Sequence, residues 1–353
     1  MLLAREDKFE EFKEDVNKIL NVKFLLLYFS NKPILIFELG YKMNNALILN
    51  EDYLEFHAKP VLKWAGGKGM LLPQITENLP TKLKFGAIKR YIEPFVGGGA
   101  VFFELANNYN FEDAYLFDVN PELVILYNVI KNNVEDLIAE LSTLQQAYNK
   151  AQDKTALYYA IRDEYNQFDK NVDANKYTIS FIRRAALTVC LNRTCFNGLF
   201  RVNSKGLFNV PVGKYKNPRI LDENNLREVS KALQCATILQ TDFASALDYV
   251  TADTFIYYDP PYRPINASSF NSYAVGDFDD DEQRRLKDVF SKAGDLGALQ
   301  MLSNSDPTNY NPKDMFFDSL YRDYKIHRIW AKRMINADPN GRDGVRELLI
   351  TNY

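Results

Sequence analysis

Cysteine and histidine are scarce in this chain. Its 353 residues contain three cysteines and two histidines. They are scattered, with no zinc-ligand spacing and no disulfide framework. We therefore expect no metal site, and we expect a reducing, cytoplasmic setting. The chemistry must come from carboxylates, aromatic rings, backbone groups or a bound cofactor. The residues concerned are Cys190, Cys195, Cys235, His57 and His327.

Long apolar runs are also lacking. The most apolar stretch, residues 24–39, is interrupted by Ser30-Asn31-Lys32-Pro33. Each half is shorter than the roughly 20 residues that a membrane helix needs. The charged N-terminus does not resemble a secretory signal. We predict no membrane partner, and we interpret residues 1–57 as an N-terminal extension of unknown role. This extension would hold a helix at 8–20 and two short strands around the Asn31-Lys32-Pro33 turn.

Short apolar, β-rich runs alternate with helical patterns along much of the chain. Near-continuous apolar strands between helices are typical of an α/β protein whose parallel sheet is covered on both faces. Ligands of such sheets bind outside the carboxyl ends of the strands. Gly97-Gly98-Gly99, Asp118, Asp242 and Asp259 fall at such ends. The predicted strands are 90–95, 114–118, 236–239, 254–259 and 299–303, and the helices between them include 121–132 and 280–293.

The alternation stops over residues 134–234, which predict a second, mainly helical domain inserted into the first. Helical patterns cover 134–150, 153–166 and 178–192. A β-hairpin is expected next, with strands 199–203 and 207–210 around the Ser204-Lys205-Gly206 turn.

Charge is distributed unevenly. A net charge of −3 by itself argues against a nucleic-acid partner. Yet residues 176–219 hold nine Lys or Arg and no Asp or Glu, leaving 34 basic residues against all 46 acidic ones elsewhere. Cations meet phosphates, amides read base edges and aromatic rings stack on bases. We therefore favour DNA binding over a merely solvated basic face. The block also carries Phe196, Phe200, Phe208, Tyr215, Asn192, Asn197, Asn203 and Asn209.

A glycine-rich turn follows the first predicted strand and opens a helix at 101–106. Glycines there allow a tight turn and close approach of the backbone to a nucleotide-like ligand. Asp118 lies 21 residues after Gly97, at the end of the next strand, where a carboxylate would hydrogen-bond ribose hydroxyls. The alternative role of Asp118 is a helix N-cap before Pro121, and one carboxylate can serve both.

The tetrapeptide Asp259-Pro260-Pro261-Tyr262 follows a buried strand. Two prolines make a rigid turn that cannot continue a sheet. The turn holds the Asp259 carboxylate and the Pro260 carbonyl as two acceptors beside the Tyr262 ring. An exocyclic amine on a nucleobase offers two N–H donors and a flat ring, so this arrangement suits it.

Together these motifs resemble the Dam-type DNA adenine-N6 methyltransferases, and the likeness is close to the GATC-modifying ones. The matching segments are 60–68, 93–100, 191–203, 208–211 and 259–262. The resemblance implies a Rossmann-like sheet dependent on S-adenosylmethionine (SAM) with an inserted, mainly helical target-recognition domain that contains a β-hairpin. Residues 58–133 and 235–353 would form the SAM-binding catalytic domain, and 134–234 the DNA target-recognition domain.

The resemblance also implies roles for individual residues. The catalytic residues would be Asp259, Pro260 and Tyr262. Contacts to the cofactor SAM would come from Trp64, Gly66, Lys68, Phe95, Gly97, Asp118, Asp242 and Asp259, with Asp242 near its adenine. Contacts to double-stranded DNA would come from Arg193, Phe196, Asn197, Arg201, Lys214, Tyr215 and Lys216. Arg201 would contact a guanine, Phe196 would wedge into the duplex, and no residue would hold a metal.

The expected reaction rotates an adenine out of the duplex and transfers a methyl group directly to N6. Cytosine-C5 chemistry is excluded, because it requires a cysteine after a proline and no cysteine here follows one. Cytosine-N4 methylation and a catalytically inactive DNA-binding relative stay open as alternatives. So does the setting, a prokaryote or a phage, with or without a restriction endonuclease acting on the same site. We also predict that residues 263–278 form a mobile lid.

Overall fold

The computed structural model describes residues 22–29, 32–39, 57–263, 278–331 and 345–353. The chain separates into two compact units, residues 1–53 and 54–353. In the first unit, β1 (Val22–Phe29) pairs antiparallel with β2 (Lys32–Leu39), as the two predicted strands require. The predicted helix at 8–20 and most of the predicted lid lie outside the described residues.

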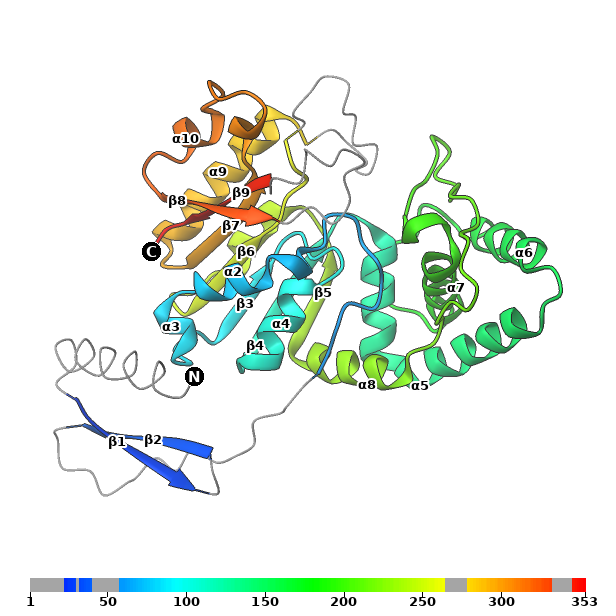
Figure 1. Cartoon of the computed structure of the whole chain (residues 1–353), viewed down its shortest axis with the longest axis horizontal. Helices are drawn as coiled ribbons and strands as arrows, with labels where there is room; N and C mark the ends of the chain where they lie inside the picture. Colours follow the sequence, from blue (N-terminus) through cyan, green and yellow to red (C-terminus); the bar gives the residue numbers. More distant parts are fainter. Residues whose placement is uncertain (1–21, 30–31, 40–56, 264–277, 332–344) are drawn as a thin grey trace. The chain divides into compact units, whose positions relative to one another are not determined.

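The second unit is built on a seven-stranded sheet in the order β5-β4-β3-β6-β7-β9-β8 (Figure 1). The first five of these are parallel neighbours, and each corresponds to a predicted strand. The last two, β8 and β9, were not predicted, and β9 runs antiparallel to both its neighbours. The sheet is therefore mixed rather than wholly parallel, and the α/β class is confirmed. The strands are β3 (Arg90–Glu93), β4 (Asp113–Asp118), β5 (Ala236–Gln240), β6 (Thr254–Tyr258), β7 (Leu299–Ser305), β8 (Lys325–Ala331) and β9 (Val345–Thr351).

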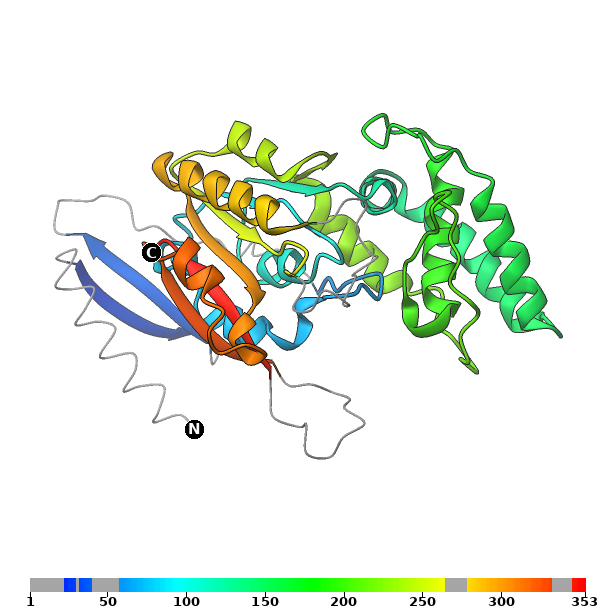
Figure 2. The same cartoon turned by 90° about the horizontal axis from the view of Figure 1, so that it is seen from above.

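Both faces of this sheet are buried. Along β6, Phe255 and Tyr257 join one apolar cluster while Ile256 and Tyr258 join another. The alternation follows the two-residue period of a strand, and it explains why a strand covered on both faces is apolar throughout. Helix α9 lies along one face (Figure 2), where Leu286 and Phe290 enter the second cluster.

Helices and short 3-10 turns connect the strands. Within the described residues no helix has the length and apolarity that crossing a membrane would require. The α-helices are α2 (Leu72–Glu77), α3 (Thr81–Lys84), α4 (Ala100–Asn108), α5 (Pro121–Lys150), α6 (Lys154–Asn166), α7 (Phe181–Thr194), α8 (Glu223–Ala232), α9 (Asp280–Asp295) and α10 (Phe316–Leu320).

The inserted segment stands to one side of the sheet, with α6 and α7 at its outer end (Figure 1). Helix α5 begins beside the sheet and continues into this segment through a non-helical residue, Asn133 (φ −141°, ψ 47°). The kink falls where the sequence predicts the domain boundary, and the boundary itself stays a prediction. The predicted hairpin is present but shorter than expected. It consists of the Val202–Phe208 bridge and two backbone hydrogen bonds, from Asn203 to Leu207 and from Asn209 to Arg201.

Candidate active site at the carboxyl edge of the sheet

Strands β3 and β6 are neighbours at the point where the order of the strands reverses. In open α/β sheets, this point opens a crevice outside the carboxyl ends of the strands. The glycine-rich turn follows β3 and the Asp259–Tyr262 tetrapeptide follows β6. The topology therefore brings together two motifs that are about 160 residues apart in the sequence.

A buried ion pair forms the centre of the site. Lys68 Nζ lies 2.6 Å from Asp259 Oδ1, and the side chains are 6% and 20% exposed. Ser303 Oγ, from β7, also donates to Asp259 Oδ1 at 3.0 Å. Among the described residues, Lys68 and Ser303 both contact the Oδ1 atom of this carboxylate. A carboxylate held from one side in this way is oriented before any ligand binds.

Tyr262 lies on the other side of the same lysine. Lys68 Nζ is 4.6 Å from the centre of the Tyr262 ring, within the range of a cation–π contact. The Tyr262 hydroxyl donates to Glu347 Oε2 on β9. Burial holds the pKa of Tyr262 well above its usual range, so this hydroxyl stays protonated. Glu347 was not predicted from the sequence, because its strand was not recognised.

The glycine-rich turn has the backbone conformation that glycine alone adopts easily. Gly97 and Gly99 have φ values of 48° and 71°. A Cβ atom on Gly99 would lie 2.7 Å from the Phe103 ring. The Tyr127 hydroxyl donates to the Gly97 carbonyl at 2.8 Å. The turn is thus packed tightly against the side chains of Phe103 and Tyr127.

Asp118 closes this turn. Its carboxylate accepts from Gly97 N at 3.0 Å and from Asn120 N at 2.9 Å. The side chain that caps α5 is Asn120, which accepts from Glu122 N, so the alternative role of Asp118 as the helix cap is wrong. Burial raises the pKa of Asp118 to about 6 despite these backbone donors.

Asp242 stands at the end of β5 and caps a 3-10 helix, η4 (Phe243–Tyr249). Its carboxylate is also held by Arg285 of α9, with N–O distances of 2.8 and 2.7 Å. The Arg285 guanidinium lowers the pKa of Asp242 and lies 3.9 Å from the centre of the Phe243 ring. Phe95 stacks on the same ring at 5.3 Å. Phe95 and Asp242 therefore lie close together through Phe243 and Arg285. Arg285 was not predicted from the sequence.

Trp64 contacts both the glycine-rich turn and Phe200 of the inserted segment. A Cβ atom on Gly97 would lie 3.2 Å from the Trp64 indole Cδ1, and one on Gly98 would lie 3.0 Å from the Trp64 Cβ atom. The same ring stacks on Phe200 with centroids 5.6 Å apart. Gly66, whose φ is 78°, offers its carbonyl to Lys68 Nζ at 2.9 Å. Trp64, Gly66 and Lys68 thus lie together beside the turn.

The turn at residues 196–198, in the segment predicted to recognise DNA, carries an exposed aromatic side chain. Phe196 is 48% exposed, although it belongs to a short turn pinned by its backbone bond to Pro211. Asn197 has a φ of 54°, the one positive φ outside glycine among the described residues. Asn192, counted in the sequence with amides that read bases, is instead 2% exposed. Its amide bonds to the Lys63 backbone and the Gly198 carbonyl, so its expected role in base reading is wrong.

The predicted cations of this segment differ in their surroundings. Arg201 donates through Nε to Asn209 Oδ1 at 2.8 Å, which orients its guanidinium. Lys214 and Lys216 are exposed, and the Tyr215 hydroxyl accepts from Lys63 Nζ at 3.3 Å. Arg193 is half-buried and donates to the Val61 carbonyl, so this structure places it toward the protein interior.

In the folded structure, part of the positive charge of the acid-free basic block, residues 176–219, is neutralised by nearby carboxylates. Four of its cations form ion pairs with carboxylates that lie outside the block in the sequence. These cations are Lys176, Arg183, Arg184 and Arg219. Within the described part of the chain, five have no carboxylate partner: Arg193, Arg201, Lys205, Lys214 and Lys216. Most of the unpaired charge therefore lies in the second half of the block, around the hairpin.

Two of the three cysteines, Cys190 and Cys195, are buried. Burial raises the pKa of Cys190 to about 12 and that of Cys195 to about 11, so neither is a thiolate at neutral pH. No cluster of three or more His, Cys, Asp or Glu suited to a metal ion occurs among residues 57–263, 278–331 and 345–353.

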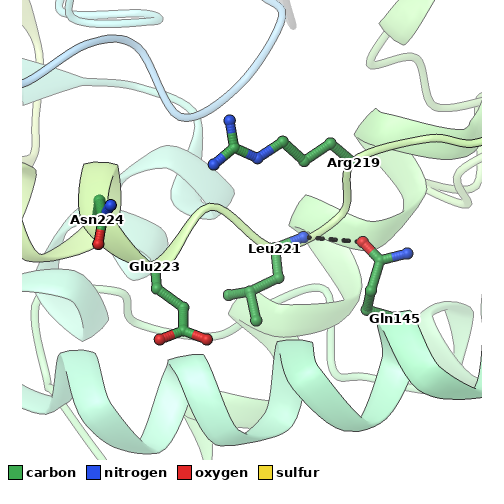
Figure 3. A pocket seen from close by; sticks show the side chains of 5 residues that line it. All are labelled: Gln145, Arg219, Leu221, Glu223 and Asn224. Carbon is green, nitrogen blue, oxygen red and sulfur yellow. Dashed lines mark hydrogen bonds between the residues drawn. The ribbon is translucent and has the colours of Figure 1, made fainter.

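A separate pocket lies between α5 and α8, away from the residues predicted for the site (Figure 3). Leu221 N donates across it to Gln145 Oε1 at 3.3 Å. Its lining is Gln145, Arg219, Leu221, Glu223 and Asn224.

Comparisons with known proteins agree with this geometry. A family model described as D12 class N6 adenine-specific DNA methyltransferase matches residues 64–335. The chain is 49% identical over 299 residues to the type II methyltransferase M.MjaIII of Methanocaldococcus jannaschii, covering 84% of this chain and 99% of that protein. It is 37% identical to the type II methyltransferase M1.LlaDCHI of Lactococcus lactis, covering 85% and 97%. It is 31% identical to the DNA adenine methylase of Escherichia coli K12, covering 82% and 93%.

Proposed function

The chain belongs to the D12 class of N6 adenine-specific DNA methyltransferases, and from this premise we propose that it methylates adenine within GATC in double-stranded DNA, with SAM as donor and Asp259 and Tyr262 at the reaction centre. Family membership makes the enzyme an adenine rather than a cytosine-N4 methyltransferase. The observation that carries the proposed site is the Lys68–Asp259–Ser303 arrangement, in which both partners contact Oδ1; we assign Oδ2 to the substrate amine.

The described residues fit SAM. A positive-φ glycine turn without side chains allows backbone contact with an amino acid and ribose, and Asp118 stands at the adjoining strand end to accept ribose hydroxyls. The half-buried Phe95 ring, which stacks on the buried Phe243, is the aromatic side chain that we assign to the adenine of SAM. When bound, SAM supplies an electrophilic methyl group on a sulfonium centre. Trp64, Gly66, Lys68 and Asp242 complete the proposed set of cofactor contacts.

Catalysis would come from positioning and electrostatics. Asp259 Oδ2 accepts one N–H of the adenine amine and the Pro260 carbonyl accepts the other. Together they raise the electron density on N6 and aim its lone pair. The Tyr262 ring stacks on the base after it has left the duplex. Lys68, whose Nζ lies 2.6 Å from Asp259 Oδ1, holds this carboxylate in place. The proton released from N6 passes to the group that already accepts its hydrogen bond.

On the DNA side, the unpaired cations suit contact with phosphates, and the exposed Phe196 suits a wedge between base pairs. Arg201 is our candidate for a guanine contact, because Asn209 orients its guanidinium and a forked contact needs a fixed plane. Asn197, Tyr215, Lys214, Lys216 and Arg193 remain proposed DNA contacts on the resemblance stated above.

Sequencing of methylated sites tests the proposed specificity. Expressed in a host without DNA methylation, the enzyme is expected to place N6-methyladenine in GATC and nowhere else at comparable frequency. An Asp259→Ala variant serves as the control and is expected to leave the DNA unmodified. N6-methyladenine in a different sequence would contradict the GATC proposal, and N4-methylcytosine would contradict the reaction.

The same assay separates specificity from general affinity. Arg201→Ala is expected to relax discrimination at one guanine by about 1–3 kcal/mol, the usual value of a forked contact. Lys216→Ala is expected to weaken binding evenly across sequences, as loss of a phosphate contact does. Equal loss on all sequences in both variants would contradict the role given to Arg201.

Two relatives are named type II methyltransferases. This supports the further proposal that the enzyme works in the cytoplasm and protects DNA from a separate endonuclease that cuts the same site. Methylated DNA is then expected to resist a GATC-cutting endonuclease only when SAM was supplied.

Asp118 predicts a pH dependence of cofactor binding. Only the carboxylate accepts a ribose hydroxyl well, and with a pKa of about 6 it is protonated as the pH falls below that value. The dissociation constant of SAM, measured by calorimetry, is expected to rise about tenfold between pH 7 and pH 5. The fold itself should not weaken through this group, because a raised pKa means that the folded state holds the proton more tightly than the unfolded chain.

Asp118→Asn is the matched control for this titration. It is expected to bind SAM weakly, with no change from this position between pH 7 and pH 5. A pH-independent affinity in the unaltered enzyme would contradict the role given to Asp118.

A further inference from the structure

Glu347 reaches the active site from a strand that runs against the others. In β9 it lies opposite Ser305 of β7 and Ile329 of β8. Because β9 is antiparallel to β7, its first residues lie at the edge where the parallel strands end. The third residue of this strand therefore arrives beside the tetrapeptide that follows β6. The four final residues of β9 are buried in the core, whereas Val345, Arg346 and Glu347 are half-buried.

The contacts of Glu347 run continuously to the reaction centre. Its Oε2 accepts from the Tyr262 hydroxyl, the Tyr262 ring lies under Lys68 Nζ, and Lys68 is paired with Asp259. Burial raises the pKa of Glu347, while the cation of Lys68 opposes that rise. Glu347 is thus close enough to Lys68 and Asp259 for their charges to affect its pKa, and its hydrogen-bond donor is the Tyr262 hydroxyl.

The backbone of Tyr262 is already restrained on one side. Pro260 and Pro261 restrict the chain that leads into it. The ring, however, still turns about two side-chain torsions, and a turn about either would change the plane presented to a stacked base. A hydrogen bond at the hydroxyl holds the ring at its far end, so that both ends of the side chain are restrained.

We propose that Glu347 is a positioning residue that orients the Tyr262 ring for stacking on the target adenine by accepting the hydrogen bond of its hydroxyl. The inference rests on the stacking role given to Tyr262 under the proposed function. Glu347 touches neither the transferred methyl group nor the amine. Its loss should act on the alignment of the base and leave SAM affinity unchanged.

The test uses a duplex in which 2-aminopurine replaces the target adenine. This base brightens on leaving the duplex and is quenched again when a ring stacks on it. Glu347→Ala is expected to give a brighter complex than the unaltered enzyme and to lower kcat on normal DNA about a hundredfold. The dissociation constants of SAM and DNA should stay within about twofold. Glu347→Gln, which keeps an acceptor oxygen, is expected to recover part of both signals.

Tyr262→Phe removes the same hydrogen bond from the other side and keeps the ring. It is expected to match Glu347→Ala in brightness, and the double variant is expected to lose no more activity than either single one. Tyr262→Phe also covers the case in which Glu347→Ala does not fold. Glu112→Gln, at the opposite edge of the sheet with an exposed side chain, is the matched control and should leave every signal unchanged.

Two results would overturn the inference. The first is a Glu347→Ala or Tyr262→Phe complex as dim as that of the unaltered enzyme. The second is an additive loss of activity in the double variant. Tyr262→Ala distinguishes these two results from failure of the stacking role given to Tyr262. If it too leaves the complex dim, Tyr262 does not stack on the base and the inference falls with the stacking role; if it is bright, only the part given to Glu347 is wrong.

Discussion

Replacement of Asp259 by alanine is expected to lower kcat by at least about 10³-fold while the protein still binds DNA. The variant removes the acceptor that we propose for the adenine amine, and loss of one such preorganised hydrogen-bonding group typically costs about 10²- to 10³-fold. The further loss comes from Lys68, which would face the base as an unpaired cation 5% exposed to solvent. Methyl transfer in a single turnover, together with a DNA-binding titration, measures both parts.

The same substitution is expected to lower stability, because removing one partner of a buried ion pair typically costs about 3–5 kcal/mol. Asp259 is 20% exposed, so the lower end of that range is expected here. Asp259→Asn keeps the volume and separates loss of charge from loss of shape. Asp253→Ala, just before the same strand at the opposite edge of the sheet, is the control and should retain full activity. Methylation within tenfold of the unaltered enzyme in Asp259→Ala would contradict the assignment.

Replacement of Arg184 by alanine is expected to lower the free energy of unfolding by about 3–5 kcal/mol. Arg184, on α7, is 3% exposed and its partner Glu122, in the first turn of α5, is 6% exposed. The guanidinium bonds to both carboxylate oxygens and to the Asp169 carbonyl. Its removal would leave the Glu122 carboxylate buried without a cation, in the helix that joins the sheet to the inserted domain. Urea unfolding followed by circular dichroism measures the change.

The neighbouring Arg183 provides a matched control. It bonds to Glu164 and Glu140 with comparable distances, but its side chain is 36% exposed. Solvent screens such a pair, so Arg183→Ala is expected to cost at most about 1 kcal/mol. Equal losses in the two variants would contradict the view that burial makes the Arg184–Glu122 pair important. A double replacement, Arg184→Met with Glu122→Leu, is expected to recover much of the lost stability, since it leaves no unpaired buried charge.

These two arginines show the limit of counting charges along a sequence. Both belong to the 44-residue block without acids, and both are paired with carboxylates from other helices. The block predicted a nucleic-acid partner correctly, and family membership confirms that the substrate is DNA. A count of its nine cations nevertheless overestimates the positive charge that is available to phosphates, because some of these cations are paired with carboxylates. Which cations remain unpaired depends on which helices pack together, and local composition carries no such information.

The five parallel strands were predictable because each is covered on both faces and is apolar along its length. Strands β8 and β9 were not, since β8 lies at the edge of the sheet and mixes Lys325, His327 and Arg328 with apolar residues. The omission of β9 also hid Glu347. A run such as Leu348-Leu349-Ile350 predicts a buried strand, but neither the direction of that strand nor its neighbours follow from the run itself.

The sequence by itself determined the chemistry of this enzyme. Its motifs are short and contiguous, so their backbone geometry and functional groups can be inferred from neighbouring residues alone. Examples are the prolines after Asp259, the glycines after Glu93 and the acid at position 118. Tertiary structure decided that Lys68 and Ser303 contact Asp259, that Asn192 is buried, that Arg285 holds Asp242, and that Glu347 meets Tyr262. Each of these joins residues that are distant along the chain. Such contacts depend on strand order, strand direction and burial, which only the packing of the whole chain establishes.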